Sequence, residues 1–306
     1  GVYIMHNIND FISVNEYFQK TPSFFALVEG KRVKDQLDYS NPVLHDEIIK
    51  KIKIYLKKNP ETTAIALNPN DIEKYCQCDK CKINTNKYKA ESANLLMMLN
   101  AVAKEFPNIQ FSTLAFKTNR KPPVGLKINS NINMVVCDIE ANKIEPIKTS
   151  TYFQNVRFRE DLKDWVKLND DILVWHYVSW YPHSMAPFPI FDKIQADLKY
   201  FSEEKVKGVF LEGDGGLFAD FNDLKAFYCA KMMWNPNENS DQIINEYLKY
   251  DFGEASSDIM SYYKLLEKKF NDNKTELNTG DESILKATNG YLSSKNIQMY
   301  RNILTT

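Results

Sequence analysis

The sequence feature that most constrains the fold is an alternation of short apolar runs with longer stretches of helical periodicity. Runs such as Met134-Val135-Val136 are apolar at every position, which is typical of strands covered on both faces. Strands separated by helices form βα units and a parallel sheet. The runs that predict strands are Val2–His6, Ala64–Leu67, Ile109–Phe116, Asn133–Ile139, Ile172–Val178 and Val209–Leu211.

The turn after the first strand decides between two architectures with a parallel sheet. A doubly wound sheet normally has a glycine-rich turn after its first strand, and this chain has none. We therefore predict an α/β, (β/α)8 TIM-barrel-like fold, N-terminally truncated, whose six strands are the third to the eighth. Residues 1–236 form the barrel, and residues 237–306 form a C-terminal helical segment packed on it. The predicted helices lie at 42–56, 90–106, 155–168, 191–201, 220–234, 240–250, 255–270 and 282–304.

Charge and hydropathy exclude two classes of partner. The chain has 39 basic and 40 acidic side chains and a net charge of −1. A net charge near zero excludes nucleic-acid binding driven by an overall positive charge of the protein. No window holds the roughly 18 apolar residues that a membrane span requires. Phosphate-binding loops of the G-x-x-x-x-G-K-[ST] type are absent as well. We predict no cofactor, and the oligomeric state is left open.

In TIM barrels the reactive groups lie at the carboxyl ends of the strands. Carboxylates, amides and aromatic rings gather at those positions here, which suits a carbohydrate ligand, although strand ends are polar in any barrel. An aromatic cluster on and after one strand predicts either a sugar platform or ordinary packing; its members are Trp175, Tyr177, Trp180 and Tyr181. The residues predicted to contact the ligand are His6, Asn70, Asp71, Trp175, Tyr177, Trp180 and Asp214.

Glu140 and Glu212 are the predicted catalytic pair. Glycoside hydrolysis needs an acid for the leaving oxygen and a second carboxylate, or a substrate group in its place. Glu212 follows an apolar run and precedes a glycine-rich turn, where backbone can approach a ligand closely. The structural alternatives are a cap at Glu212, a salt bridge at the rim at Glu140, and a helix cap at Asp71.

Cys76, Cys78 and Cys81 form a C-x-C-x-x-C run. Zinc sites use four nitrogen or sulfur ligands, and the fourth is missing locally. A zinc site, a local disulfide with one spare thiol, and three reduced structural cysteines therefore stay open. We predict no metal in the catalytic site.

Several blocks resemble, in the same order, those of a bacterial family catalogued as domain of unknown function 4838. The segment from Thr21 to Arg32 is similar to a "HPEYFAL-x-x-GKR" block, with Thr21 in place of the usual His. The other blocks are Gln36-Leu37, Ser40–Val43, Asn70-Asp71 with the cysteine run, Thr113–Phe116 with Pro122-Pro123, Val136–Glu140, Trp175–Tyr177, Pro187–Pro189, Gly208–Phe210 and Trp234–Pro236.

Part of that family is classed as glycoside hydrolase family 163. The resemblance implies a (β/α)8 barrel and endo-β-N-acetylglucosaminidase activity on N-glycans, with the substrate's acetamido group as nucleophile. It also implies an extracellular or periplasmic location, with a signal peptide and an N-terminal domain upstream. Two alternatives remain: a hydrolase for uronic-acid polysaccharides, and a non-catalytic glycan-binding protein on the same scaffold.

Overall fold

The computed structural model describes residues 6–214, 216, 218–273 and 275–305. The chain folds into two compact units. The first unit comprises residues 1–137 and 161–173, and the second comprises residues 138–160 and 174–306. The helix α6 (Phe153–Leu168) and the strand β6 (Ile172–Tyr177) each contribute residues to both units. The predicted domain boundary at residue 236 stays a prediction.

The first unit is built on parallel strands that follow one another in chain order. Ala64 to Ala66 of β3 pair with Gln110 to Ser112 of β4, and Phe111 to Ala115 of β4 pair with Ile132 to Val136 of β5. The start of β6 continues this order, since Met134 N–H donates to the carbonyl of Asp171 at 3.1 Å. The elements of this unit are α1 (Ile8–Phe11), α2 (Val14–Tyr17), η1 (Pro22–Phe24), β1 (Phe25–Val28), β2 (Lys31–Leu37), α3 (Pro42–Lys58), β3 (Ala64–Ala66), α4 (Asp79–Tyr88), α5 (Ser92–Glu105), β4 (Gln110–Ala115), η2 (Lys117–Asn119) and β5 (Ile132–Cys137).

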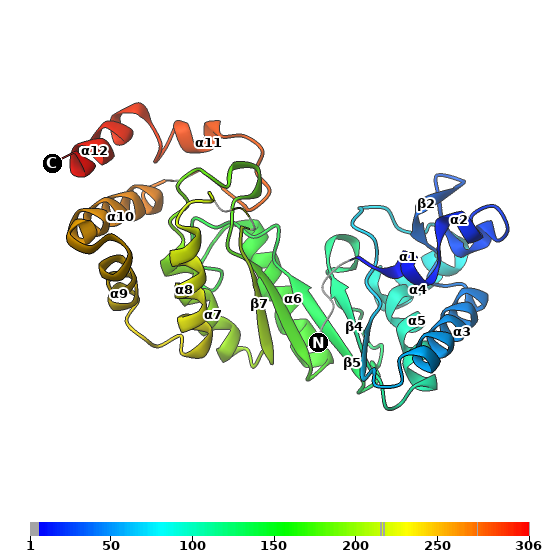
Figure 1. The fold of residues 1–306 in the computed structure, drawn as a ribbon. Helices are drawn as coiled ribbons and strands as arrows, with labels where there is room; N and C mark the ends of the chain where they lie inside the picture. The colour runs from blue at the N-terminus through cyan, green and yellow to red at the C-terminus, as the bar shows by residue number, and fades with distance from the viewer. Residues whose placement is uncertain (1–5, 215, 217, 274, 306) are drawn as a thin grey trace. The chain divides into compact units, whose positions relative to one another are not determined.

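Helices cover this sheet because their apolar faces match its buried strands. The helix α5 packs against α3 and against β4 and β5 (Figure 1). Asn41 caps α3, since its side chain accepts the Val43 N–H bond at 3.0 Å and Pro42 occupies the first helical position. The antiparallel hairpin β1–β2 forms a separate two-stranded sheet.

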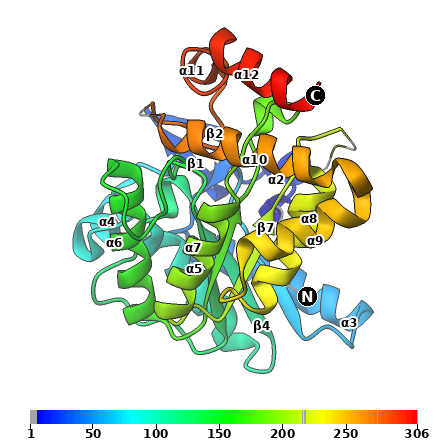
Figure 2. The same ribbon diagram turned by 90° about the vertical axis from the view of Figure 1, so that its left-hand side faces the viewer.

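The second unit places helices around the end of β6 and β7. Val178, just after β6, donates its N–H to the carbonyl of Glu212 at 2.9 Å. The helix α8 packs against both α7 and α9, α9 packs against α10, and α10 packs against α12 (Figure 2). The elements of this unit are η3 (Tyr181–His183), α7 (Phe191–Glu203), β7 (Gly208–Glu212), α8 (Asn222–Trp234), α9 (Ser240–Phe252), η4 (Gly253–Ala255), α10 (Ser256–Asn271), α11 (Leu285–Thr288) and α12 (Ser294–Leu304).

An extended segment after α10 runs along the loops that follow β5 and β6. Lys143 N–H donates to the Leu277 carbonyl at 2.8 Å, and Tyr181 N–H donates to the Thr279 carbonyl at 3.1 Å. The Tyr291 hydroxyl donates to the Pro187 carbonyl at 2.8 Å. Residues near the C-terminus therefore hold the loops at the strand ends of the second unit.

The α/β, TIM-barrel-like class predicted from the alternating pattern is confirmed in general terms, and five of the six predicted strands are present. The sixth, Val2–His6, falls mostly on residues 1–5, which lie outside the described residues. The predicted helix 282–304 is instead two helices, α11 and α12. A β-carbon at Gly290, in this break, would lie 2.6 Å from Oδ1 of Asn273, so any larger residue would require the Asn273 side chain to shift. No helix in the described part of the chain combines the length and apolarity needed to cross a membrane.

Candidate functional site

Glu212 is the last residue of β7, and its side chain accepts a hydrogen bond from a donor of the second unit. The indole N–H of Trp175, on the neighbouring strand β6, donates to Oε2 of Glu212 at 2.5 Å. The phenol of Tyr181 lies close enough to this carboxylate to be electrostatically coupled to it. Burial raises the pKa of Tyr181, and the nearby carboxylate of Glu212 raises it further. The tyrosine therefore stays protonated beside the carboxylate.

Aromatic rings surround this carboxylate. Trp175 stacks on Tyr177 with ring centroids 5.7 Å apart and an interplanar angle of 14°. Phe210 meets Trp175 edge-on at 5.4 Å, and Tyr181 meets Tyr177 edge-on at 6.0 Å. Tyr177 is buried, whereas Trp175 and Tyr181 are partly exposed. The exposed ring surface beside a carboxylate is suited to the C–H face of a sugar.

Asp214 provides a second carboxyl near Tyr181. Burial raises the pKa of Asp214; the positive charge of Lys225 opposes this shift and the negative charge of Asp220 adds to it. The charge of Asp214 also contributes to the raised pKa of Tyr181. Glu212, Tyr181 and Asp214 therefore form one electrostatically linked group.

Glu140 follows β5 and forms an ion pair with Arg157 of α6. The Glu140 side chain is 44% exposed and that of Arg157 is 26% exposed. A guanidinium beside a carboxylate favours its ionised form. Glu140 is therefore a charged, accessible group in the same unit as Glu212. It also forms the salt bridge that the sequence analysis gave as the structural alternative to a catalytic role.

Trp180 does not present a ring face to a ligand in this structure. Its side chain is 1% exposed, and its indole N–H donates to the carbonyl of Asp281 at 2.8 Å. The ring also packs against Phe188, with centroids 6.0 Å apart. Trp180 was predicted to contact the ligand, but it packs in the interior of the second unit because the segment after α10 covers it.

A buried charged network lies behind these strand ends. Nδ1 of His176 lies 2.5 Å from Oδ2 of Asp138, and Nζ of Lys143 donates to the same oxygen at 3.1 Å. Oδ1 of Asp138 accepts the backbone N–H of Tyr177 at 3.1 Å. On the other side of the imidazole, Nε2 of His176 lies 3.7 Å from Oδ2 of Asp197. All four side chains of this network (Asp138, Lys143, His176 and Asp197) are at most 2% exposed.

The two carboxyls of the network titrate in opposite directions. Burial alone would raise the pKa of Asp138, but the charges of His176 and Lys143 lower it to about 2. Burial raises the pKa of Asp197 to about 6, against the same two cations. Oδ1 of Asp197 also accepts the N–H of Ile147 at 2.7 Å. The network thus ties the backbone under Tyr177 to the loop that follows Glu140.

Sequence reasoning left this network out of the predicted site. The available signal was the alternation in β6, where His176 points away from the face of Trp175 and Tyr177. Arg157 was also missed, because nothing in the sequence joined it to Glu140. Tyr181 was named in the predicted aromatic cluster but not among the residues predicted to contact the ligand.

The predicted residues His6, Asn70 and Asp71 belong to the first unit. Nδ1 of His6 lies 2.6 Å from the carbonyl of Pro69, and the Asn70 amide donates to the Asp35 carbonyl at 2.7 Å. Asp71 forms an ion pair with Lys117 of η2 at 2.7 Å. The ligand-binding role of these three residues stays a prediction.

The three clustered cysteines also belong to the first unit, and none of them forms a disulfide. Cys76 and Cys78 lie on the loop between β3 and α4, and Cys81 lies in the first turn of α4. Their sulfur atoms converge with a carboxylate oxygen of Asp38. This is the group of side chains that could hold a metal ion among the described residues.

The sheet has parallel strands in chain order, which defines an α/β protein of the TIM-barrel-like class. Carboxyls and aromatic rings lie together at the ends of its last strands. The family model described as "Domain of unknown function (DUF4838)" matches residues 1–264. The chain therefore belongs to the domain-of-unknown-function 4838 family, as its sequence blocks predicted. No curated protein matches the chain.

Proposed function

We propose that this protein is a glycoside hydrolase that acts on N-acetylglucosamine-containing glycans by a retaining, acetamido-assisted mechanism. The observation that carries the proposal is Glu212 at the end of β7, hydrogen-bonded by Trp175, electrostatically coupled to Tyr181 and flanked by stacked rings. A carboxyl group beside an aromatic platform combines proton transfer with sugar binding. The family resemblance supports the substrate class and the use of the acetamido group.

In this proposal Glu212 is the general acid. It gives its proton to the glycosidic oxygen while the acetamide oxygen of the substrate attacks the anomeric carbon and the glycosidic bond breaks. The carboxylate left behind can still accept the Trp175 N–H. Water then attacks the anomeric carbon of the cyclic intermediate, Glu212 takes its proton, and the acetamide is regenerated with overall retention.

Glu140 is the proposed partner that orients the acetamide. Its ion pair with Arg157 keeps it ionised, and an ionised carboxylate accepts the N–H of the acetamide as positive charge develops there. Asp214, whose pKa is raised by burial, is the carboxyl that would replace Glu212 as acid if the first assignment fails.

The test is a substrate screen with matched variants. The wild-type protein is assayed on glycoprotein N-glycans, aryl N-acetylglucosaminides and uronic-acid polysaccharides. Glu212→Gln should lower turnover on the cleaved glycan by about 10² or more, the usual contribution of general acid catalysis. The control is Glu246→Gln, an exposed glutamate paired with Lys231 at 3.5 Å, which should leave turnover unchanged. Binding without cleavage of any glycan would instead support the glycan-binding alternative.

One observation favours a second candidate, a hydrolase for uronic-acid polysaccharides. Arg157 places a guanidinium beside Glu140, and Arg recognises carboxylates bidentately. A uronate substrate would compete with Glu140 for that guanidinium. Cleavage of a uronate polymer that is lost in Arg157→Gln, with no cleavage of N-acetylglucosamine substrates, would favour this candidate. For either substrate class we propose that the protein acts outside the cytoplasm.

A further inference from the structure

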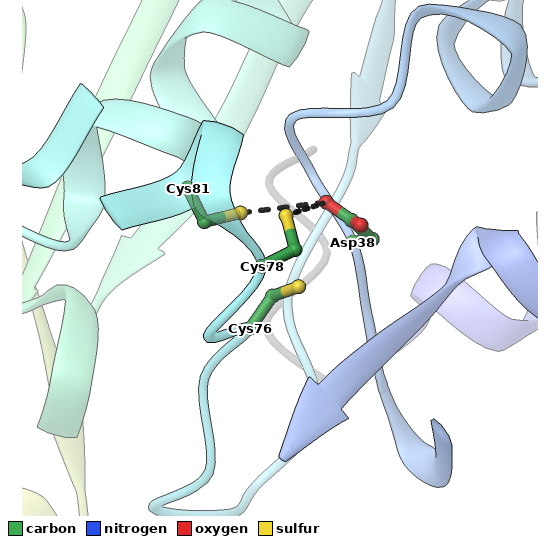
Figure 3. A group of neighbouring side chains, drawn as sticks. All are labelled: Asp38, Cys76, Cys78 and Cys81. Carbon is green, nitrogen blue, oxygen red and sulfur yellow. Dashed lines mark hydrogen bonds between the residues drawn. The ribbon is translucent and has the colours of Figure 1, made fainter. Parts of the chain in front are cut away.

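Three thiols and one carboxylate converge in the first unit, and none of them belongs to the residues proposed for catalysis (Figure 3). The ligand atoms of Asp38, Cys76, Cys78 and Cys81 all lie within 4.8 Å of one another. Oδ1 of Asp38 is 3.3 Å from Sγ of Cys81 and 3.7 Å from Sγ of Cys78. Asp38 therefore occupies the position of the fourth ligand, which the local sequence around the cysteines lacks.

The two sulfur-to-oxygen separations match the edges of a zinc tetrahedron. With Zn–S bonds of about 2.3 Å and a Zn–O bond of about 2.0 Å, tetrahedral geometry puts sulfur and oxygen about 3.5 Å apart. The two sulfur-to-oxygen distances lie 0.2 Å on either side of that value. A disulfide would use two of the sulfurs and leave a carboxylate aimed at a buried thiol.

The surroundings are those of a prepared site. Asp38, Cys76 and Cys81 are buried, and Cys76 and Cys81 pack with Ala26 in a small apolar cluster. The backbone N–H of Leu27 donates to Sγ of Cys76 at 3.3 Å. Such a bond stabilises a thiolate, the form in which cysteine binds a metal.

Neighbouring polar groups fix the carboxylate. The Ser40 hydroxyl donates to Oδ1 of Asp38 at 2.7 Å, and Arg32 pairs with Oδ2 at 3.1 Å. Outer groups of this kind orient the ligands of metal sites. His45 is not a competing ligand, since its Nε2 lies 2.8 Å from the carbonyl of Tyr39 and is used there.

Charge and donor type select the ion. Three thiolates and a carboxylate carry four negative charges, and buried charge of that density requires a cation. Arg32 supplies only one positive charge. Thiolate-rich tetrahedral sets select zinc, and a set of four protein ligands with no open position defines a structural site.

We propose that Asp38, Cys76, Cys78 and Cys81 bind one Zn²⁺ ion as a structural Cys₃Asp centre. The ligands come from three places: the residue after β2, the loop between β3 and α4, and the first turn of α4. The ion joins the β1–β2 hairpin to the loop that carries Asn70 and Asp71. Zinc thus fixes the backbone at the end of β3.

The experiment measures metal content and affinity in the purified protein. Wild-type protein should contain one zinc per chain, and after removal of the metal it should take up one Zn²⁺ in competition with a chromophoric chelator. Asp38→Asn and Cys78→Ser should each weaken the affinity by tenfold or more. The matched controls are Asp35→Asn, an exposed carboxylate of β2 paired with Lys74, and Cys137→Ser, a thiol of β5 outside the cluster. Both controls should bind as the wild type does.

A second measurement needs no variant. Co²⁺ loaded into the metal-free wild-type protein should give the intense ligand-field bands of a tetrahedral ion and a near-ultraviolet thiolate-to-cobalt charge-transfer band. A protein that binds no stoichiometric Zn²⁺ when its thiols are reduced, gives octahedral Co²⁺ spectra, or loses no affinity in Asp38→Asn would overturn the proposal. A disulfide within the cluster that persists in the purified protein and excludes zinc would overturn it as well.

Discussion

Replacing Asp138 by Asn tests the buried network under the strand ends. The side chains of Asp138 and Lys143 are 0% and 2% exposed, so water cannot replace the lost charge. Oδ2 faces donors from His176 and Lys143, and Oδ1 faces the N–H of Tyr177. In either orientation of an asparagine amide, its NH₂ group would face a donor. Removing one partner of a buried ion pair costs about 3–5 kcal/mol.

For a unit of about 150 residues, a loss of about 3–5 kcal/mol corresponds to a fall in Tm of roughly 6–20 °C. Differential scanning calorimetry of the purified variant measures it. The control is Asp241→Asn, whose partner Lys264 lies 2.5 Å away, with the two side chains 60% and 40% exposed. An exposed pair contributes at most about 1 kcal/mol. A Tm for Asp138→Asn no lower than that of Asp241→Asn would refute the reasoning.

The pH dependence of the same variant gives an independent check. The pKa of Asp138 is lowered to about 2, so its stabilising contribution is present above the unfolded value of about 3.9 and is lost as pH falls through about 2. The difference in Tm between wild type and Asp138→Asn should therefore be full at pH 5 and above, and should shrink between pH 4 and pH 2. A difference that stays constant over that range would contradict the charge pairing.

Three further predictions follow from the same structure. Because the pKa of Asp197 is raised to about 6, its contribution to stability is lost as pH rises from about 4 to 6. When Tm is measured against pH, the wild type should show the resulting fall in Tm over this range, and Asp197→Asn should not. Trp175→Phe keeps a ring but removes the donor to Glu212, and kcat/KM on the cleaved glycan should fall about tenfold or more, because a hydrogen bond to a charged group contributes about 1.5–3 kcal/mol. Chelation of the proposed zinc should lower the Tm of the wild type by roughly 5–10 °C, since a ligand at 100 times its Kd stabilises by about 2.7 kcal/mol, and should leave that of Cys78→Ser unchanged.

The strands of the parallel sheet could be predicted, because a strand that is buried on both faces consists mostly of consecutive apolar residues. In β5, Met134 to Val136 are buried and all apolar, so this strand is visible in the sequence as a short apolar run. The β1–β2 hairpin contains no such apolar run in its second strand, because Lys31 to Leu37 is mostly charged or polar. Its available signal was the turn itself: Glu29 and Gly30 both have positive φ, the conformation of a two-residue hairpin turn.

The candidate site was predictable only where strand order brings residues together. Glu212 and Trp175 lie on neighbouring strands, so their contact follows from the βα pattern. Asp38 is the opposite case. It is separated from Cys76 by 38 positions and belongs to a hairpin that the sequence pattern did not predict, so the fourth member of the cysteine cluster emerged only from the fold. The burial of Trp180 likewise depends on the distant segment that holds Asp281.

The central claim is that Glu212 protonates the leaving group of a glycan. The most direct test compares kcat of the wild type and Glu212→Gln on an unactivated N-glycan and on an aryl N-acetylglucosaminide with a good leaving group. The glutamine amide oxygen can still accept the Trp175 bond, so the site keeps its shape. The account predicts a loss of about 10² or more on the glycan and a much smaller loss on the aryl substrate, whose leaving group needs little protonation. Equal losses on both substrates, or full turnover on the glycan, would contradict it.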